Sequence, residues 1–231
     1  LHALMREIWT RLKNSNALNT DTAVAISQSA EAAVKEMGLE GRFAELERER
    51  LAKLAREWLE LERRRAPFEV LFTEQQRDLE FAGLHFQSRI DRMDKLERGG
   101  HVLIDYKGAR MLSPKDWDGP RPDDPQLPLY AVAAPEELAA VVFAKVLPGE
   151  MRFMGYSQAE SLLPKVQVYR DWKKLLAQWK QDAEALAASF GAGDARVDPK
   201  YELKTCRRCD LQTLCRVYEK FSGLRSEEGG G

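Results

Sequence analysis

Asp91, Asp105 and Lys107 lie in the segment "RIDRMDKLERGGHVLIDYKGA", residues 89–109, which reads as two strands joined by a Gly-Gly turn. If residues 97–99 form a three-residue loop, the strands pair so that Asp91 lies directly opposite Asp105, with Cβ atoms about 4.5–5.5 Å apart. Two carboxylates this close repel each other unless a cation lies between them or one is protonated. Lys107 shares the strand face of Asp105, because alternate residues point the same way. The spacing therefore predicts a site for a divalent metal ion such as Mg²⁺, beside a lysine that orients water or balances charge on a phosphoryl group.

An exposed hairpin, with its aspartate and lysine solvated or paired across the strands, is the alternative interpretation. An isolated Asp-x-Lys sequence favours that alternative. Here the four residues before Asp105 are "HVLI", a continuous apolar run typical of a buried strand. Charged groups at the end of a buried strand cost free energy unless they are paired or bound to metal, so this context favours the metal site.

The elements that would position these residues follow from the apolar pattern. Apolar residues at helical spacing predict helices over 1–12, about 21–37, 42–65 and 169–190, and another that begins at Gln126. The expected apolar stripe of the third helix consists of Phe43, Leu46, Leu51, Leu54, Trp58 and Leu61. Apolar runs between turn residues predict three or four antiparallel strands over 68–108 and buried strands over 138–147 and 150–157. This order indicates an α/β or α+β fold with one mixed sheet.

Composition limits the class of protein. The chain has 231 residues, 44% of them hydrophobic and 32% charged, which is typical of a globular protein with one large or two small domains. Its net charge of -1 gives no overall attraction to nucleic acid, so such contacts must depend on local patches. No run approaches the roughly 18 apolar residues of a membrane span, and the start lacks the pattern of a signal peptide. We expect a cytoplasmic protein with no membrane partner and, because it does not begin with Met, a piece of a longer polypeptide.

The segment "GLHFQSRIDRMDKLERGGHVLIDYKGA", followed by "DPQLPLYAVAA", resembles the nuclease domain of the RecB family within the PD-(D/E)XK superfamily. It is especially similar to the C-terminal nuclease domains of AddB-like and RecB-like helicase–nuclease DNA repair proteins. That family shows, in order, a glycine, an "RIDRID" strand, a short turn, an "IDYKTG" strand and a "QLPLY" helix. The resemblance implies a restriction-endonuclease-like core, in which helices flank a central mixed sheet.

The resemblance also implies how the chain is organised. We expect a single nuclease domain over 1–225, with a disordered-type end at 226–231. Within it we expect N-terminal helices over 1–66 and a catalytic core sheet over 67–168. A helix over 169–192 and a cysteine-containing tail over 196–221 would follow.

Carried over residue by residue, the resemblance assigns roles to seven positions. Asp91 and Asp105 would be metal ligands, and Lys107 would be the catalytic lysine. Gln126 and Tyr130 would form the Gln-x-x-x-Tyr pair that supports the site and contacts DNA. His2 would be a helix-borne histidine ligand, and Glu74 a supporting acid. The sequence departs from the family where Gly108-Ala109 replaces Thr-Gly and where only Leu1 precedes His2. On sequence alone, a single histidine at a helix start is more often a surface residue, and the resemblance makes the two interpretations of His2 equal.

The function that the resemblance implies is a Mg²⁺- or Mn²⁺-dependent deoxyribonuclease. It would be an exonuclease that acts on single-stranded DNA or duplex ends in recombination and double-strand-break repair. A helicase region or subunit would be its partner. The alternative is a catalytically silent DNA-binding or structural module of a repair complex.

Three cysteines near the C-terminus, Cys206, Cys209 and Cys215, have the spacing C-x2-C-x5-C. Thiolates at this spacing can bind a metal or cluster, with the first two cysteines on one tight turn, but three ligands are one short of the usual four. In AddB-like nucleases, a fourth cysteine upstream of the histidine helix completes a [4Fe–4S] cluster, so the resemblance implies such a cluster in a longer protein. A zinc site completed by a histidine, or reduced thiols without metal, are the alternatives.

Two further features have both a functional and a structural interpretation. The basic run Arg63-Arg64-Arg65 could contact phosphates or be a solvated helix end. Trp117, in a proline-rich loop, could stack on a base or pack beneath that loop.

Overall fold

The computed structural model describes residues 1–108, 113–201, 203–207 and 209–216. The chain divides into two compact units, Leu1–Ala187 and Ala188–Gly231. Among the described residues, the strands lie in the first unit and are β1 Phe68–Phe81, β2 Leu84–Leu96, β3 His101–Lys107, β4 Leu138–Lys145, β5 Arg152–Ser157 and β6 Gln167–Val168. The α-helices that begin in this unit are α1 His2–Leu12, α2 Ala23–Glu36, α3 Gly41–Glu62, α4 Gln126–Ala133 and α5 Trp172–Gly191. The second unit contains α6 Leu203–Cys206 and α7 Gln212–Cys215.

The six strands form one mixed sheet in the order β1-β2-β3-β4-β5-β6. Neighbours are antiparallel at β1/β2, β2/β3 and β4/β5, and parallel at β3/β4 and β5/β6. The parallel β3/β4 pair needs a crossover, and the chain between these strands contains α4. The predicted mixed α/β architecture is therefore confirmed, and it is consistent with a restriction-endonuclease-like fold.

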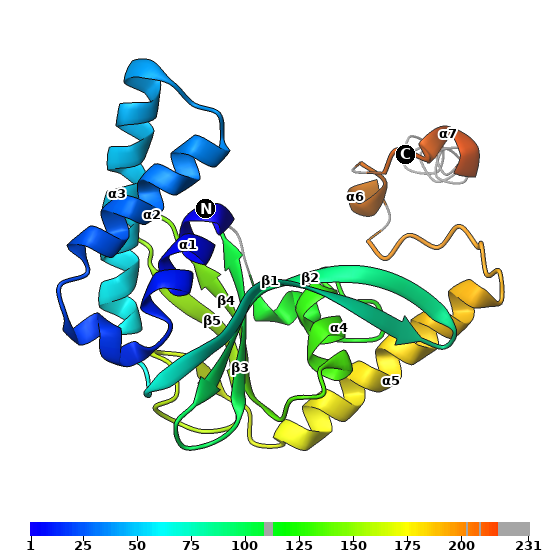
Figure 1. Cartoon of the computed structure of the whole chain (residues 1–231). Coiled ribbons are helices and arrows are strands. Elements are labelled where there is room, and N and C mark those ends of the chain that lie inside the picture. The colour runs from blue at the N-terminus through cyan, green and yellow to red at the C-terminus, as the bar shows by residue number, and fades with distance from the viewer. Residues whose placement is uncertain (109–112, 202, 208, 217–231) are drawn as a thin grey trace, which may run out of the picture. The chain divides into compact units, whose positions relative to one another are not determined.

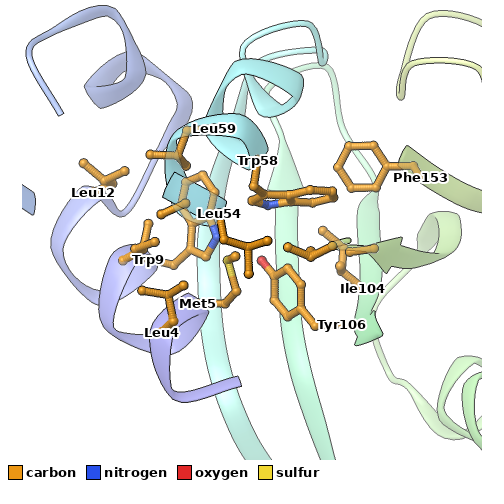
Figure 2. Packing of buried hydrophobic residues seen from close by; sticks show 14 of the residues in the cluster. Leu4, Met5, Trp9, Leu12, Leu54, Trp58, Leu59, Ile104, Tyr106 and Phe153 are labelled. Atoms are coloured by element: carbon orange, nitrogen blue, oxygen red, sulfur yellow. The ribbon is translucent and has the colours of Figure 1, made fainter. Parts of the chain in front are cut away.

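Helices cover both faces of the sheet (Figure 1). On β3, Val102, Ile104 and Tyr106 pack into the core formed with α1, α2 and α3, whereas Leu103 packs into the core formed with α4 and α5. This alternation follows from the period of two along a strand. Figure 2 shows the first core, in which Tyr106 lies close to Trp58 of α3. The other face of β3, which carries Asp105 and Lys107, therefore looks toward the α4 side.

The register between β2 and β3 is the predicted one. Arg92 pairs with Ile104 and Lys95 with His101, so the next position along the ladder puts Asp91 opposite Asp105. The turn between these strands requires glycine at Gly100, where φ is 79° and a Cβ atom would lie 2.8 Å from the Cβ of Ala139. A slip of one residue would have turned Asp91 to the other face.

The apolar stripe predicted for the third helix is wrong at its start. Phe43 is 65% exposed and Leu46 is 48% exposed, whereas the residues of α3 from Leu51 onward include most of its buried side chains. The N-terminal part of α3 extends beyond the strands of the sheet (Figure 1).

No helix in the described ranges combines the length and apolar character that crossing a bilayer requires.

Candidate active site

Asp91 of β2 and Asp105 of β3 form a pair of buried carboxylates. The backbone N–H of Tyr106 donates to Asp91 Oδ2 at 2.8 Å, which fixes the orientation of that carboxylate. Burial, and then the negative charge of Asp91, raise the pKa of Asp105 to about 6. The predicted pairing of the two aspartates is thus present, with the electrostatic repulsion that it implies.

Lys107 lies beside the carboxylate pair, and its Nζ is 2.8 Å from Asp105 Oδ2. The ammonium of Lys107 therefore pairs directly with this buried oxygen and partly neutralises Asp105. Burial lowers the pKa of Lys107, but the interaction with Asp105 outweighs burial and leaves the pKa raised. Lys107 is therefore an ammonium group at neutral pH.

Gln126 and Tyr130 connect Lys107 to the β2 strand. Lys107 Nζ donates to Gln126 Oε1 at 3.2 Å, and Gln126 Nε2 donates to Tyr130 Oη at 3.0 Å. Tyr130 Oη in turn donates to the carbonyl of Arg89 at 3.1 Å. Residues four apart on a helix share one face, so α4 presents both side chains to the site. The two residues hold the lysine, and their predicted contact with DNA stays a prediction.

His2 reaches the same site from the first turn of α1. Its Nε2 lies 3.2 Å from Asp91 Oδ2 and 3.0 Å from the carbonyl oxygen of Tyr106. The hydrogen bond to Asp91 is the main cause that raises the pKa of His2. Although its side chain is half exposed, His2 is therefore part of the carboxylate site and not merely a surface residue.

Glu74 lies at an irregular point of β1. Its φ of 52° is unusual for a residue with a side chain. It falls between the pairs Thr73–Arg92 and Gln75–Ile90, which puts it opposite Asp91. Its carboxylate forms an ion pair with Arg89, with Nε and Oε2 2.9 Å apart, and its charge contributes to the raised pKa of His2. Glu74 is thus close to the site, and its role as a supporting acid stays a prediction.

The two aspartates fit a hard divalent cation, because both carboxylates are buried and they repel each other. Mg²⁺ is typically held by one or two carboxylates, while water and phosphate complete its shell. Among the described residues, no group of three or more His, Cys, Asp or Glu side chains is arranged to hold a metal ion. His2 and Asp91 contact each other instead of converging on a common point. The geometry therefore supports the aspartate pair, and the role of His2 as a further ligand stays a prediction.

On the opposite face of the hairpin lies a buried charge cluster of Glu62, Arg65, Arg92 and Asp94 that was not predicted. All four side chains are fully buried. Arg92 bonds to Asp94 at 2.6 and 2.7 Å and to Glu62 at 2.8 Å. Arg65 bonds to Glu62 at 2.6 Å and to Asp94 at 2.8 Å. The cluster corrects the interpretation of Arg65, which is an internal ion-pair partner and not a phosphate contact.

The buried charge cluster is joined to the site through Tyr106. Arg92 Nη1 donates to Tyr106 Oη at 2.8 Å, and its guanidinium lies 3.7 Å from the ring centroid of Trp9. The backbone of Tyr106 contacts Asp91 through its N–H and His2 through its carbonyl. The sequence contains one indication of this charge cluster: arginine and aspartate alternate with apolar residues on a strand that the pattern predicts to be buried.

Trp117 packs in the core and does not offer a face to a base. It is fully buried, and its ring contacts those of Phe143, Tyr156 and Trp179 edge to face. The short helix Pro114–Trp117 turns the side chain inward, toward the α5 side of the sheet.

Within the second unit, the cysteines show part of the predicted geometry. The N–H of Cys209 donates to the carbonyl of Cys206 at 3.1 Å, which is the expected tight turn. Cys206 is buried, Cys209 and Cys215 are partly exposed, and all three are free thiols. A cluster at these residues stays a prediction.

One of two comparisons with known proteins gives a match. The family profile of the PD-(D/E)XK nuclease superfamily matches residues 1–216, a span that includes the aspartate pair, Lys107 and all three cysteines. A search of curated proteins finds no match.

Proposed function

We propose that this chain, which belongs to the PD-(D/E)XK nuclease superfamily, hydrolyses DNA phosphodiester bonds at Asp91, Asp105 and Lys107 with a divalent metal ion. The observation that carries the proposal is the buried aspartate pair with a protonated lysine 2.8 Å from one of its oxygens. No purely structural need explains two repelling carboxylates at the end of a buried strand.

Asp91 and Asp105 would hold Mg²⁺ or Mn²⁺. When bound, such an ion lowers the pKa of a coordinated water molecule and stabilises charge on phosphate oxygens. The N–H of Tyr106 keeps Asp91 oriented for this task. Lys107, which is protonated in the metal-free chain, would donate to a phosphate oxygen or orient the attacking water. Gln126 limits the positions that the ammonium can take.

The biological setting is part of the proposal and depends on the resemblance alone. We propose an exonuclease of recombination and double-strand-break repair that works with a helicase. The three cysteines would bind a [4Fe–4S] cluster together with a ligand from outside this sequence.

The test is cleavage of end-labelled single-stranded and blunt duplex DNA in Mg²⁺ or Mn²⁺. Asp105→Asn and Lys107→Met should each lower the cleavage rate by about 10²-fold or more, since each removes a group that faces the reacting phosphate. Asp78→Asn, at an exposed position of β1, is the matched control and should cleave at the wild-type rate. Circular dichroism checks that every variant is folded.

Retained cleavage in both site variants would overturn the assignment. A wild-type chain that binds DNA but neither cleaves it nor binds Mn²⁺ through Asp91 and Asp105 would support the alternative, a silent module of a repair complex.

A further inference from the structure

Beside the aspartate pair lies a second basic side chain, Arg89, to which neither the sequence pattern nor the proposed chemistry gives a role. It precedes Asp91 by two residues on β2, so the two side chains share a strand face. Its guanidinium is 63% exposed, yet its Nε contacts Glu74 Oε2 at 2.9 Å. An exposed arginine is thus held against a carboxylate at the margin of the site.

We propose that Arg89 binds a DNA phosphate next to the one that is cleaved, and that Glu74 holds Arg89 until DNA takes its place. This inference rests on the proposed nuclease function and identifies a residue that binds the DNA substrate. Arg89 would be a substrate-binding residue, and Glu74 a positioning residue that acts through it.

The backbone of Arg89 is fixed while its side chain is accessible. Tyr130 Oη donates to the Arg89 carbonyl, and Gln126 links Tyr130 to Lys107. The position of Arg89 is therefore tied to the position of Lys107 by three consecutive hydrogen bonds. A phosphate that Arg89 holds would thus have a defined place relative to the lysine.

A cation such as Arg89 reduces the repulsion between DNA and the negative charges around the site. Asp91, Asp105 and Glu74 bring three carboxylates to the neighbourhood, and a DNA strand is itself an anion. An ion pair whose arginine is exposed stabilises the fold little, so exchange of its carboxylate for a phosphate costs little free energy. A guanidinium matches phosphate oxygens with two parallel hydrogen bonds, which makes phosphate a strong competitor.

The exchange couples DNA binding to the metal site. Glu74 lies opposite Asp91 and close enough to His2 to affect its pKa. Once Arg89 turns to a phosphate, the charge of Glu74 is no longer neutralised and adds to the negative field at the aspartate pair. Removal of Arg89 should therefore weaken DNA binding but strengthen binding of a divalent cation, whereas structural damage would weaken both.

The experiment measures these two affinities separately on the full chain. Binding of Mn²⁺ without DNA is followed by calorimetry, and binding of a fluorescent single-stranded oligonucleotide without metal is followed by anisotropy at several salt concentrations. Arg89→Ala should weaken DNA binding about 3- to 10-fold and reduce the slope of log K against log salt by about 0.7, the value for one phosphate contact on a single strand. Its affinity for Mn²⁺ should equal or exceed that of the wild type. Glu74→Gln should show the reverse: tighter DNA binding and weaker Mn²⁺ binding.

Arg77→Ala is the matched control. Arg77 lies on β1, which pairs with β2, and forms a similar ion pair with Glu136 at 2.6 Å. It is farther along the β1–β2 hairpin from the aspartates than Arg89 is. It should leave DNA affinity and salt slope unchanged. An equal loss in Arg77→Ala, or weaker Mn²⁺ binding in Arg89→Ala, would overturn the proposal. Because neither assay depends on cleavage, an inactive wild-type chain would reject the proposed function without deciding this one.

Discussion

Asp105 is the residue at which folding and function make opposite demands. Its ordinary pKa is 3.8, and burial together with the charge of Asp91 raises the pKa to about 6 in the folded chain. Between about pH 4 and pH 6 the folded state therefore binds more protons than the unfolded state. Stability contributed by this group falls as pH rises through that window, and the penalty is complete above about pH 6.

Asp105→Asn should consequently stabilise the metal-free protein while it lowers the cleavage rate. We expect the free energy of unfolding at pH 7.5 to rise by about 1–3 kcal/mol, because a pKa shift of one unit corresponds to about 1.4 kcal/mol. The lost ion pair with Lys107 offsets part of the gain. Urea denaturation in EDTA at pH 7.5 and pH 4 measures the effect, which should vanish at the lower pH. A variant less stable than the wild type at pH 7.5 would contradict the expected conflict.

The positions of single residues were predicted well where strand register or helix spacing determines them. Asp91 and Asp105 meet because a short turn sets their register, and Gln126 and Tyr130 share a helix face because they are four residues apart. Arg92 was not predicted to be internal, since its partner Glu62 lies 30 residues away and only the packing of α3 on the sheet brings them together.

At the scale of the elements, the β2–β3 hairpin does most to build the site. Its turn contains Gly99 and Gly100, both with positive φ, and Gly100 also approaches Ala139 closely. Substitution of Gly100 would add both backbone strain and a steric clash with β4. The turn between β1 and β2 offers a comparison, because Gly83 has a φ of 80° but nothing within 4 Å of its missing Cβ.

Gly100→Ala should therefore destabilise the chain more than Gly83→Ala. We expect roughly 1 kcal/mol for Gly83→Ala, from strain alone, and about 2–4 kcal/mol for Gly100→Ala. Gly100→Ala should also weaken Mn²⁺ binding, because the clash disturbs the strands that carry both aspartates. Chemical denaturation and Mn²⁺ titration measure the two effects. Equal destabilisation by both substitutions would show that the contact with Ala139 is easily relieved.

Helices and strands were predicted correctly where the apolar period is strong. The burial of individual residues along an element was not predicted correctly. The helix over 42–65 was expected to bury one stripe throughout its length, yet Phe43 and Leu46 are exposed. Periodicity indicates which residues share a face, and only the neighbouring elements decide whether that face is covered. The same limit applies to β2, whose inward charges are stable because α3 supplies Glu62.

At the scale of the whole molecule, proposed metal ligands and cysteines lie in different compact units. Asp91, Asp105 and His2 belong to Leu1–Ala187, whereas Cys206, Cys209 and Cys215 belong to Ala188–Gly231. A net charge of -1 provides no general attraction for divalent cations. Stabilisation of the chain by Mn²⁺ should therefore come from one local site.

Addition of Mn²⁺ at about 100 times its Kd should stabilise the wild type by about 2.7 kcal/mol, since the ion relieves the repulsion between Asp91 and Asp105 and binds the folded state only. For a protein of this size the Tm should rise by about 5–10 °C, as measured by differential scanning fluorimetry. The double variant Asp91→Asn/Asp105→Asn should show no such rise. The triple variant Cys206→Ser/Cys209→Ser/Cys215→Ser should keep the full rise, because it leaves the first unit unchanged. An equal rise in the double variant would mean that Mn²⁺ stabilises the chain elsewhere, and loss of the rise in the triple variant would assign that stabilisation to the thiols.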